Sequence, residues 1–252
     1  MIRAMNVPFD SLAVVLVFAA AYVSGGRLIA PERTEKLWAR RRTISAAAGI
    51  SVAYVFVDVL PELELQHKIV VEKAGAPMLF AEQRLYVLAM LSFVVFYGLE
   101  HMVLVSRERR PEALAAGTAD AVFRLQLAGY AAYSALIGYL VVERAGRGVV
   151  PLILYMIAMA VHFLIVDHAL EEEHGRAYQA WGRRLLAASV LVGWLIGVMA
   201  PLSEVAIARL FAVLAGGVVI TSLRAELPDD REGRFWPFCI GAMVFAAALI
   251  VG

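Results

Sequence analysis

Long apolar stretches, separated by short groups of charged residues, dominate the sequence. Eight of them have close to the 20 or so residues that a helix needs to cross a bilayer. They cover residues 9–30, 43–62, 81–105, 120–142, 149–170, 184–202, 205–225 and 235–252. Two are interrupted by charge, because Arg124 and Arg209 lie inside the fourth and the seventh. The pattern predicts an all-α membrane protein with eight transmembrane helices in a single domain spanning residues 1–252.

Composition supports the membrane prediction and excludes several other classes. Hydrophobic residues make up 62% of the chain, against about 45–50% in soluble domains. The single cysteine, Cys239, excludes an intrachain disulfide and a cysteine-rich metal site. The net charge is +1 and no basic cluster stands out, so nucleic acid is not an expected partner. Arg3 and Asp10 before the first apolar run disfavour a signal peptide.

The distribution of lysine and arginine predicts how the chain crosses the membrane. The connections after the first, third, fifth and seventh spans carry sixteen of these residues, and the other side carries seven. Because positive residues concentrate on the cytoplasmic side, both termini are expected outside the cytoplasm. The predicted location is the plasma (inner) membrane.

Two stretches of the chain have similar sequence patterns and predict two copies of one helix. Residues 46–62 are AAAGISVAYVFVDVLPE, and residues 213–229 are VLAGGVVITSLRAELPD. Gly49 precedes Pro61 by twelve residues, as Gly216 precedes Pro228. With the predicted orientation these two helices cross the membrane in opposite directions. The pattern therefore predicts an inverted repeat of helices 1–3 and 6–8, an arrangement typical of secondary transporters.

Eight spans, outer termini and a second span that closes in Leu60-Pro61-Glu62 resemble the ZRT/IRT-like (ZIP) family of divalent metal transporters. The third span, YVLAMLSFVVFYGLEHMVL, is similar to that family's third helix. The resemblance implies a ZIP-like bundle that transports zinc, iron or manganese, and no catalytic activity. The expected partners are the lipid bilayer, the divalent metal ion and, in a homodimer, a second copy of the chain.

The chain departs from the family at the metal-binding signatures. The family's fourth helix carries His-Asn-x-Pro-Glu/Asp-Gly, where this chain reads Tyr133-Ser134-Ala135-Leu136-Ile137-Gly138. In the fifth helix His162 could stand for the family histidine, but the following signature residues differ. First-row divalent ions prefer imidazole, carboxylate or thiolate ligands. We therefore expect no strong metal ligand in the fourth helix and a site built from the fifth.

The fifth span ends in the densest polar cluster of the chain, residues 167–174 (DHALEEEH). His168 and Glu172 are four residues apart and share a helix face, and imidazole with carboxylate suits zinc, iron or manganese. The candidate metal ligands are His162, Asp167, His168 and Glu172. The alternatives are a solvated or salt-bridged helix end for the cluster and a hydrogen-bonded packing role for His162.

Two further pairs of ionisable residues lie at span ends. Asp58 and Glu62 share a face beside Pro61 and are candidates for a cation entrance. The alternatives are an ion pair between one of these carboxylates and Arg209, and simple exposure. Glu100 and His101 end the third span and are candidates for a cytoplasmic exit, or for an interfacial anchor.

Glycine and proline mark candidate packing and hinge positions: Gly49, Pro61, Gly216, Pro228, Gly193 and Gly197. Gly193 and Gly197 form a Gly-x-x-x-Gly, which favours close helix packing, and Gly49 and Gly216 are expected to pack where the repeats cross. Three functions remain open: a divalent-cation transporter, a ZIP-like scaffold without transport that binds or regulates a partner, and an intramembrane metal-dependent hydrolase.

Overall fold

The computed structural model describes residues 2–29, 34–74, 83–108, 115–226 and 235–251, and these ranges contain no β-strand. The helices are α1 (Ile2–Ile29), α2 (Thr34–Tyr54), η1 (Val55–Val59), α3 (Leu60–Ala74), α4 (Arg84–Glu108), α5 (Ala115–Ala145), α6 (Val149–His174), η3 (Tyr178–Gly182), α7 (Arg183–Met199), α8 (Glu204–Glu226) and α9 (Phe235–Val251). The predicted all-α class is confirmed.

Six helical stretches in the described ranges are long and apolar enough to cross a membrane. They are Arg42–Glu72, Arg84–Ser106, Ala121–Ala145, Val149–His174, Tyr178–Met199 and Glu204–Ser222. Phe9–Gly25 and Phe235–Val251 are apolar helices of smaller length. Large apolar side chains lie exposed on several of these helices, as lipid contact requires. Length and composition thus indicate a membrane protein.

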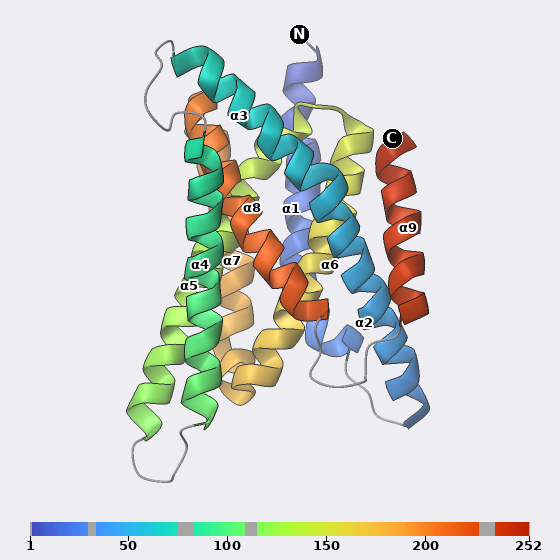
Figure 1. Cartoon of the computed structure of the whole chain (residues 1–252), viewed down its shortest axis with the longest axis vertical. Helices are drawn as coiled ribbons and strands as arrows, with labels where there is room; N and C mark the ends of the chain where they lie inside the picture. Colours follow the sequence, from blue (N-terminus) through green and yellow to red (C-terminus); the bar gives the residue numbers. More distant parts are fainter. Residues whose placement is uncertain (1, 30–33, 75–82, 109–114, 227–234, 252) are drawn as a thin grey trace.

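The helices run between two ends of one bundle. α1 begins and α9 ends at the same end, where α5 also leads into α6 (Figure 1). We call this end the terminal face, and the opposite end, where α6 leads into α7, the distal face. Chain direction therefore alternates from one long helix to the next (Figure 1).

The second long helix is continuous from α2 to α3 but changes its winding at η1, a π-helical turn. The N–H of Leu60 bonds to the carbonyl of Val55, five residues back. Pro61, directly after this turn, has no N–H to donate, so the regular hydrogen-bond ladder cannot continue through it. The helix then runs on to Ala74, well past the expected end of the span at residue 62.

Glycines let α7 approach α5 closely. A Cβ on Gly193 would lie 2.7 Å from the Cα of Ala135, and one on Gly197 would lie 2.9 Å from the carbonyl oxygen of Tyr139. In the other direction, a Cβ on Gly138 would lie 3.1 Å from the backbone nitrogen of Trp194. The packing role predicted for Gly193 and Gly197 is confirmed.

The two glycines of the sequence repeat pack against different helices. Gly49 lies against the backbone of Phe238 and Ala242 in α9, and Gly216 lies against Ala89 and Phe93 in α4. Both glycines thus lie at close helix contacts, as expected, and in each case the partner is a helix other than the second copy of the sequence repeat. Pro228 lies outside the described residues.

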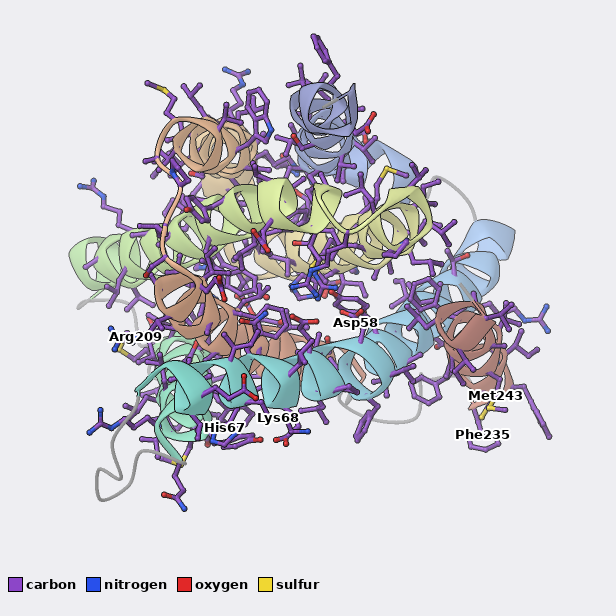
Figure 2. All side chains as sticks on the ribbon, turned by 90° about the horizontal axis from the view of Figure 1, so that it is seen from above. Asp58, His67, Lys68, Arg209, Phe235 and Met243 are labelled. Atoms are coloured by element: carbon purple, nitrogen blue, oxygen red, sulfur yellow. The ribbon has the colours of Figure 1, made fainter. Side chains whose placement is uncertain are left out.

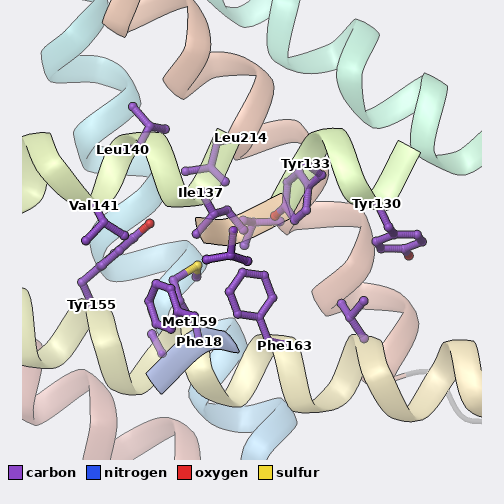
Figure 3. Packing of buried hydrophobic residues seen from close by; sticks show 14 of the residues in the cluster. Phe18, Tyr130, Tyr133, Ile137, Leu140, Val141, Tyr155, Met159, Phe163 and Leu214 are labelled. Atoms are coloured by element: carbon purple, nitrogen blue, oxygen red, sulfur yellow. The ribbon is translucent and has the colours of Figure 1, made fainter. Parts of the chain in front are cut away.

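Aromatic and branched side chains fill the centre of the bundle between α1, α5 and α6. Phe18, Ile137 and Phe163 are fully buried, and the Phe18 and Phe163 rings meet edge to face at 5.2 Å (Figure 3). Edge-to-face contact is favourable because the positive ring edge meets the negative ring face. This dry core surrounds His162, the next residue to Phe163, and so fixes the environment of the central candidate residue.

Candidate functional site

Two arginine–carboxylate pairs tie α2–α3 to the end of α5 near the terminal face. Arg144 donates to both oxygens of Asp58, at 2.9 and 3.3 Å. Arg147, in the α5–α6 connection, donates to both oxygens of Glu62, at 2.6 and 2.8 Å. Bidentate pairing is the strongest geometry for these groups. The candidate entrance carboxylates are thus held by cations of this chain.

The alternative that one of these carboxylates pairs with Arg209 was wrong. Arg209 is exposed on α8, and Figure 2 shows it at the left edge of the bundle, away from Asp58 near the middle. The true partners, Arg144 and Arg147, lie three residues apart where α5 ends, so they project from one helix end. That spacing was the available sequence signal, but nothing along the chain said which helix lay opposite.

Aromatic rings and an amide surround the two ion pairs, Asp58–Arg144 and Glu62–Arg147, and we call this group the terminal cluster. The guanidinium carbon of Arg144 lies 5.4 Å from the ring centre of Tyr155 and 5.7 Å from that of Phe211. Both distances are within the range of cation–π attraction. Gln66 donates to Glu62 at 2.7 Å. The Arg144 side chain is only 7% exposed. It is neutralised by Asp58 and lies close to two aromatic rings.

A small pocket lies among the helices at this level. Its lining residues are Gln66, Leu140, Glu143, Arg144, Arg147, Tyr155, Ile207, Phe211 and Leu214. Arg147 and Glu143 belong to the terminal face, whereas Tyr155 is almost fully buried on α6. The pocket therefore reaches from the surface to the interior beside the two ion pairs.

His162 lies deep in the middle of α6 and is 2% exposed, as predicted for a residue well inside a span. Its Nε2 is 3.4 Å from the hydroxyl of Tyr133 on α5 and 3.5 Å from the hydroxyl of Thr221 on α8. Thr221 also donates to the carbonyl of Gly217 at 2.8 Å. Three helices thus meet at one imidazole, with long rather than tight hydrogen bonds around it.

The fourth predicted span contributes hydroxyl groups here. Next to Tyr133, Ser134 shares a 2.9 Å hydrogen bond with Tyr22 of α1. The Tyr133 ring packs against His162 at 5.9 Å between ring centres. These groups are phenol and hydroxyl, so the expectation that Tyr133–Ile137 supplies no strong metal ligand stays a prediction.

Asp167 forms the centre of a second ion-pair network, nearer the distal face. It is completely buried, accepts from Tyr178 at 2.7 Å and from Arg183 at 2.8 and 3.1 Å. Arg183 also bonds to Glu171. Tyr178 lies in η3, the second π-helical turn, and Arg183 follows it directly. The salt-bridged alternative for this helix end describes Asp167 and Glu171.

The four candidate metal ligands do not gather at one point. His168 and Glu172 lie 3.2 Å apart, as their spacing predicts, while Asp167 is held by Arg183 and His162 lies deeper. Across the ranges that the structure describes, no three His, Cys, Asp or Glu side chains are grouped so that they could hold a metal ion. All four residues lie on α6, so a shared site would require α6 itself to unwind.

A neutral amide links two buried carboxylates from α4 and α6. Gln126 of α5 donates to Glu173 at 2.8 Å and lies 3.3 Å from Glu100, which also accepts from Tyr130 at 2.6 Å. The side chain of Glu173 is only 4% exposed, so the solvated alternative for this helix end does not describe it. Glu100 is buried too, whereas its neighbour His101 is exposed and stacks on Tyr97.

Replacing Tyr178 with phenylalanine should lower the free energy of unfolding by about 1.5–3 kcal/mol, because a buried carboxylate loses a charge-assisted hydrogen bond. Tyr86→Phe is the matched control, since Tyr86 bonds to Glu64 on the exposed surface. Equilibrium unfolding in detergent measures both. Equal effects in the two variants would contradict the role given to Tyr178.

Buried charges inside a membrane are costly and usually mark a functional path or its gates. Here they form two arginine–carboxylate layers, one on each side of a central imidazole. Compared with known proteins, the chain matches no protein-family model and no curated sequence.

Proposed function

We propose that the chain is a secondary transporter of a divalent metal cation, zinc, iron or manganese, on a ZIP-like scaffold of eight spans. The observation that carries the proposal is the terminal cluster. Asp58 and Glu62, the candidate entrance, each pair with an arginine at or just after the end of α5. Ion pairs between helices can open and close as helices move, so these carboxylates can be covered in one state and offered to a cation in another.

The packing of the repeat glycines supports an inverted repeat. If helices 1–3 correspond to helices 6–8, contact of the second helix with the eighth corresponds to contact of the seventh with the third. Gly49 packs on α9 and Gly216 packs on α4, which are these two contacts. Five residues after each glycine, Tyr54 and Thr221 both reach α6, at Tyr155 and His162 respectively.

In this proposal the terminal face is outside the cytoplasm, as the lysine and arginine distribution predicts. A cation would enter at Asp58 and Glu62, meet His162 at mid-depth and leave past Asp167, His168 and Glu172, with Glu100 and His101 beside the exit. Each ion pair on this route must open to release its carboxylate. Alternating opening of the two ends is the behaviour expected of inverted-repeat transporters.

The His162→Ala variant should lose metal uptake in reconstituted vesicles, because no other imidazole lies at that depth in the described helices. We expect a fall of at least about tenfold, the loss that follows removal of one interaction worth 1.4 kcal/mol. His67→Ala, which removes an imidazole of α3 that packs against Tyr86 and is not part of the proposed route, is the matched control. Uptake that survives His162→Ala would contradict this route.

One observation favours the second candidate, a ZIP-like membrane protein that binds or regulates a partner without transport. Asp58, Glu62, Asp167 and Glu171 are all paired with arginines, as purely structural carboxylates would be. Absence of zinc, iron, manganese and cadmium uptake by the wild-type protein would favour it. The hydrolase has no specific observation in its favour.

A further inference from the structure

Two tyrosine hydroxyls beside the terminal cluster lack a hydrogen bond of normal distance and angle to any described residue, and Asp58 is the nearby carboxylate for Tyr54. Tyr54 of α2 and Tyr155 of α6 are 1% and 2% exposed, and both oxygens are buried without such a bond. Their ring centres lie 6.2 Å apart, so the two side chains are neighbours across the interface between the helices. Buried hydroxyls are almost always bonded, either to protein or to ordered water.

Other buried tyrosines of this bundle have found protein partners. Tyr22 bonds to Ser134, Tyr130 to Glu100 and Tyr178 to Asp167. Buried tyrosine hydroxyls in this bundle therefore tend to be hydrogen-bonded to protein side chains. Two adjacent exceptions, in contact with each other, indicate that something other than protein satisfies them.

The pocket reaches from the surface to Tyr155, one of the two tyrosines. Tyr155 lines it together with Arg147, whose side chain is 31% exposed at the terminal face. Along α6, Tyr155 lies six residues below Val149, about 9 Å at the helical rise of 1.5 Å per residue. Arg144, Gln66 and Glu143 line the same pocket, together with the apolar residues Leu140, Ile207, Phe211 and Leu214.

We propose that Tyr54 and Tyr155 bind ordered water, and that this water is the inner end of a hydrated vestibule open to the terminal face. Water suits the site because each molecule donates and accepts, as a phenol also does. An anion would be repelled by Asp58 and Glu62, and a cation by Arg144 and Arg147. The arginines and the carboxylates already neutralise each other while the ion pairs are closed.

The existence of the vestibule does not depend on the proposed function; only its role in transport rests on that function. In a transporter it would carry the cation through water to the level of Tyr155 in the state in which the two ion pairs are open. The barrier would then lie between Tyr155 and His162, seven residues further along α6, where Met159 and Phe163 pack tightly. That places a dry barrier between the hydrated vestibule and the central imidazole.

Hydroxyl-radical footprinting of the unmodified protein tests this site. X-ray radiolysis in ¹⁸O-labelled water oxidises side chains next to bound water, and mass spectrometry reads each tyrosine. We expect Tyr54 and Tyr155 to be oxidised about tenfold faster than Tyr22 and Tyr178, which are equally buried but bonded to protein. Protection of Tyr54 and Tyr155 equal to that of the two controls would overturn the proposal.

A second measurement uses Tyr155→Phe, which keeps the ring and removes the hydroxyl. If the hydroxyl binds water, the thermal midpoint should fall by about 2–4 °C. An unchanged or higher midpoint would contradict bound water, because removing an unsatisfied polar group costs nothing. Neither measurement depends on transport, so loss of the proposed function would leave both results standing, and their failure would leave metal uptake untouched.

Discussion

The Arg144→Gln variant is expected to lose about 3–5 kcal/mol of unfolding free energy, since it leaves Asp58 as an uncompensated charge in a largely buried setting. The guanidinium also gives up its contacts with the Tyr155 and Phe211 rings. Chemical unfolding in detergent micelles or steric trapping in bicelles measures the change. This is one of the two largest effects that the structure predicts.

The control for this variant is Arg209→Gln, which removes an exposed arginine from α8 and should change stability by less than about 0.5 kcal/mol. Combining Arg144→Gln with Asp58→Asn should recover a large part of the loss, because an amide pair leaves no buried charge. A double variant as unstable as Arg144→Gln alone would show that the pairing with Asp58 is not the cause.

Gly193→Leu should separate α5 from α7 and lower stability by about 3 kcal/mol or more. A Cβ at this position would lie 2.5 Å from the carbonyl carbon and 2.7 Å from the Cα of Ala135, and backbone cannot move aside as a side chain can. Small residues at such contacts allow the close approach on which helix packing in lipid depends. The same unfolding measurement applies.

Gly98→Leu is the matched control, because a Cβ on Gly98 of α4 would meet nothing within 4 Å. Both variants insert the same side chain into an apolar helix. Helix propensity favours leucine over glycine at both positions, so a loss of stability at Gly98 equal to that at Gly193 would show that close packing is not the cause.

The sequence predicted the properties that depend on one helix at a time. Apolar length predicted helices, depth within a span predicted the burial of His162, and the Gly-x-x-x-Gly predicted a close helix contact. Each of these follows from periodicity and from the cost of polar groups in hydrocarbon. They required no knowledge of which helix lies beside which.

The partners across helices were not predictable in the same way. Asp58 bonds to Arg144, 86 residues away, whereas Arg209, the partner considered from the sequence, is exposed. The run of acids at residues 171–173 left a solvated helix end open, yet Gln126 of another helix donates a hydrogen bond to Glu173. Such contacts depend on how the helices are rotated against one another, which a single sequence leaves undetermined.

The arrangement of the terminal cluster has a consequence for cooperativity. Asp58 and Glu62 are fixed to one helix, and Arg144 and Arg147 to one helix end. While either pair is closed, it holds the partners of the other at an effective concentration in the millimolar range or above, so a single broken pair re-forms at once. The two pairs should therefore act as a bivalent clasp, released only when the end of α5 moves away from α3 as a unit.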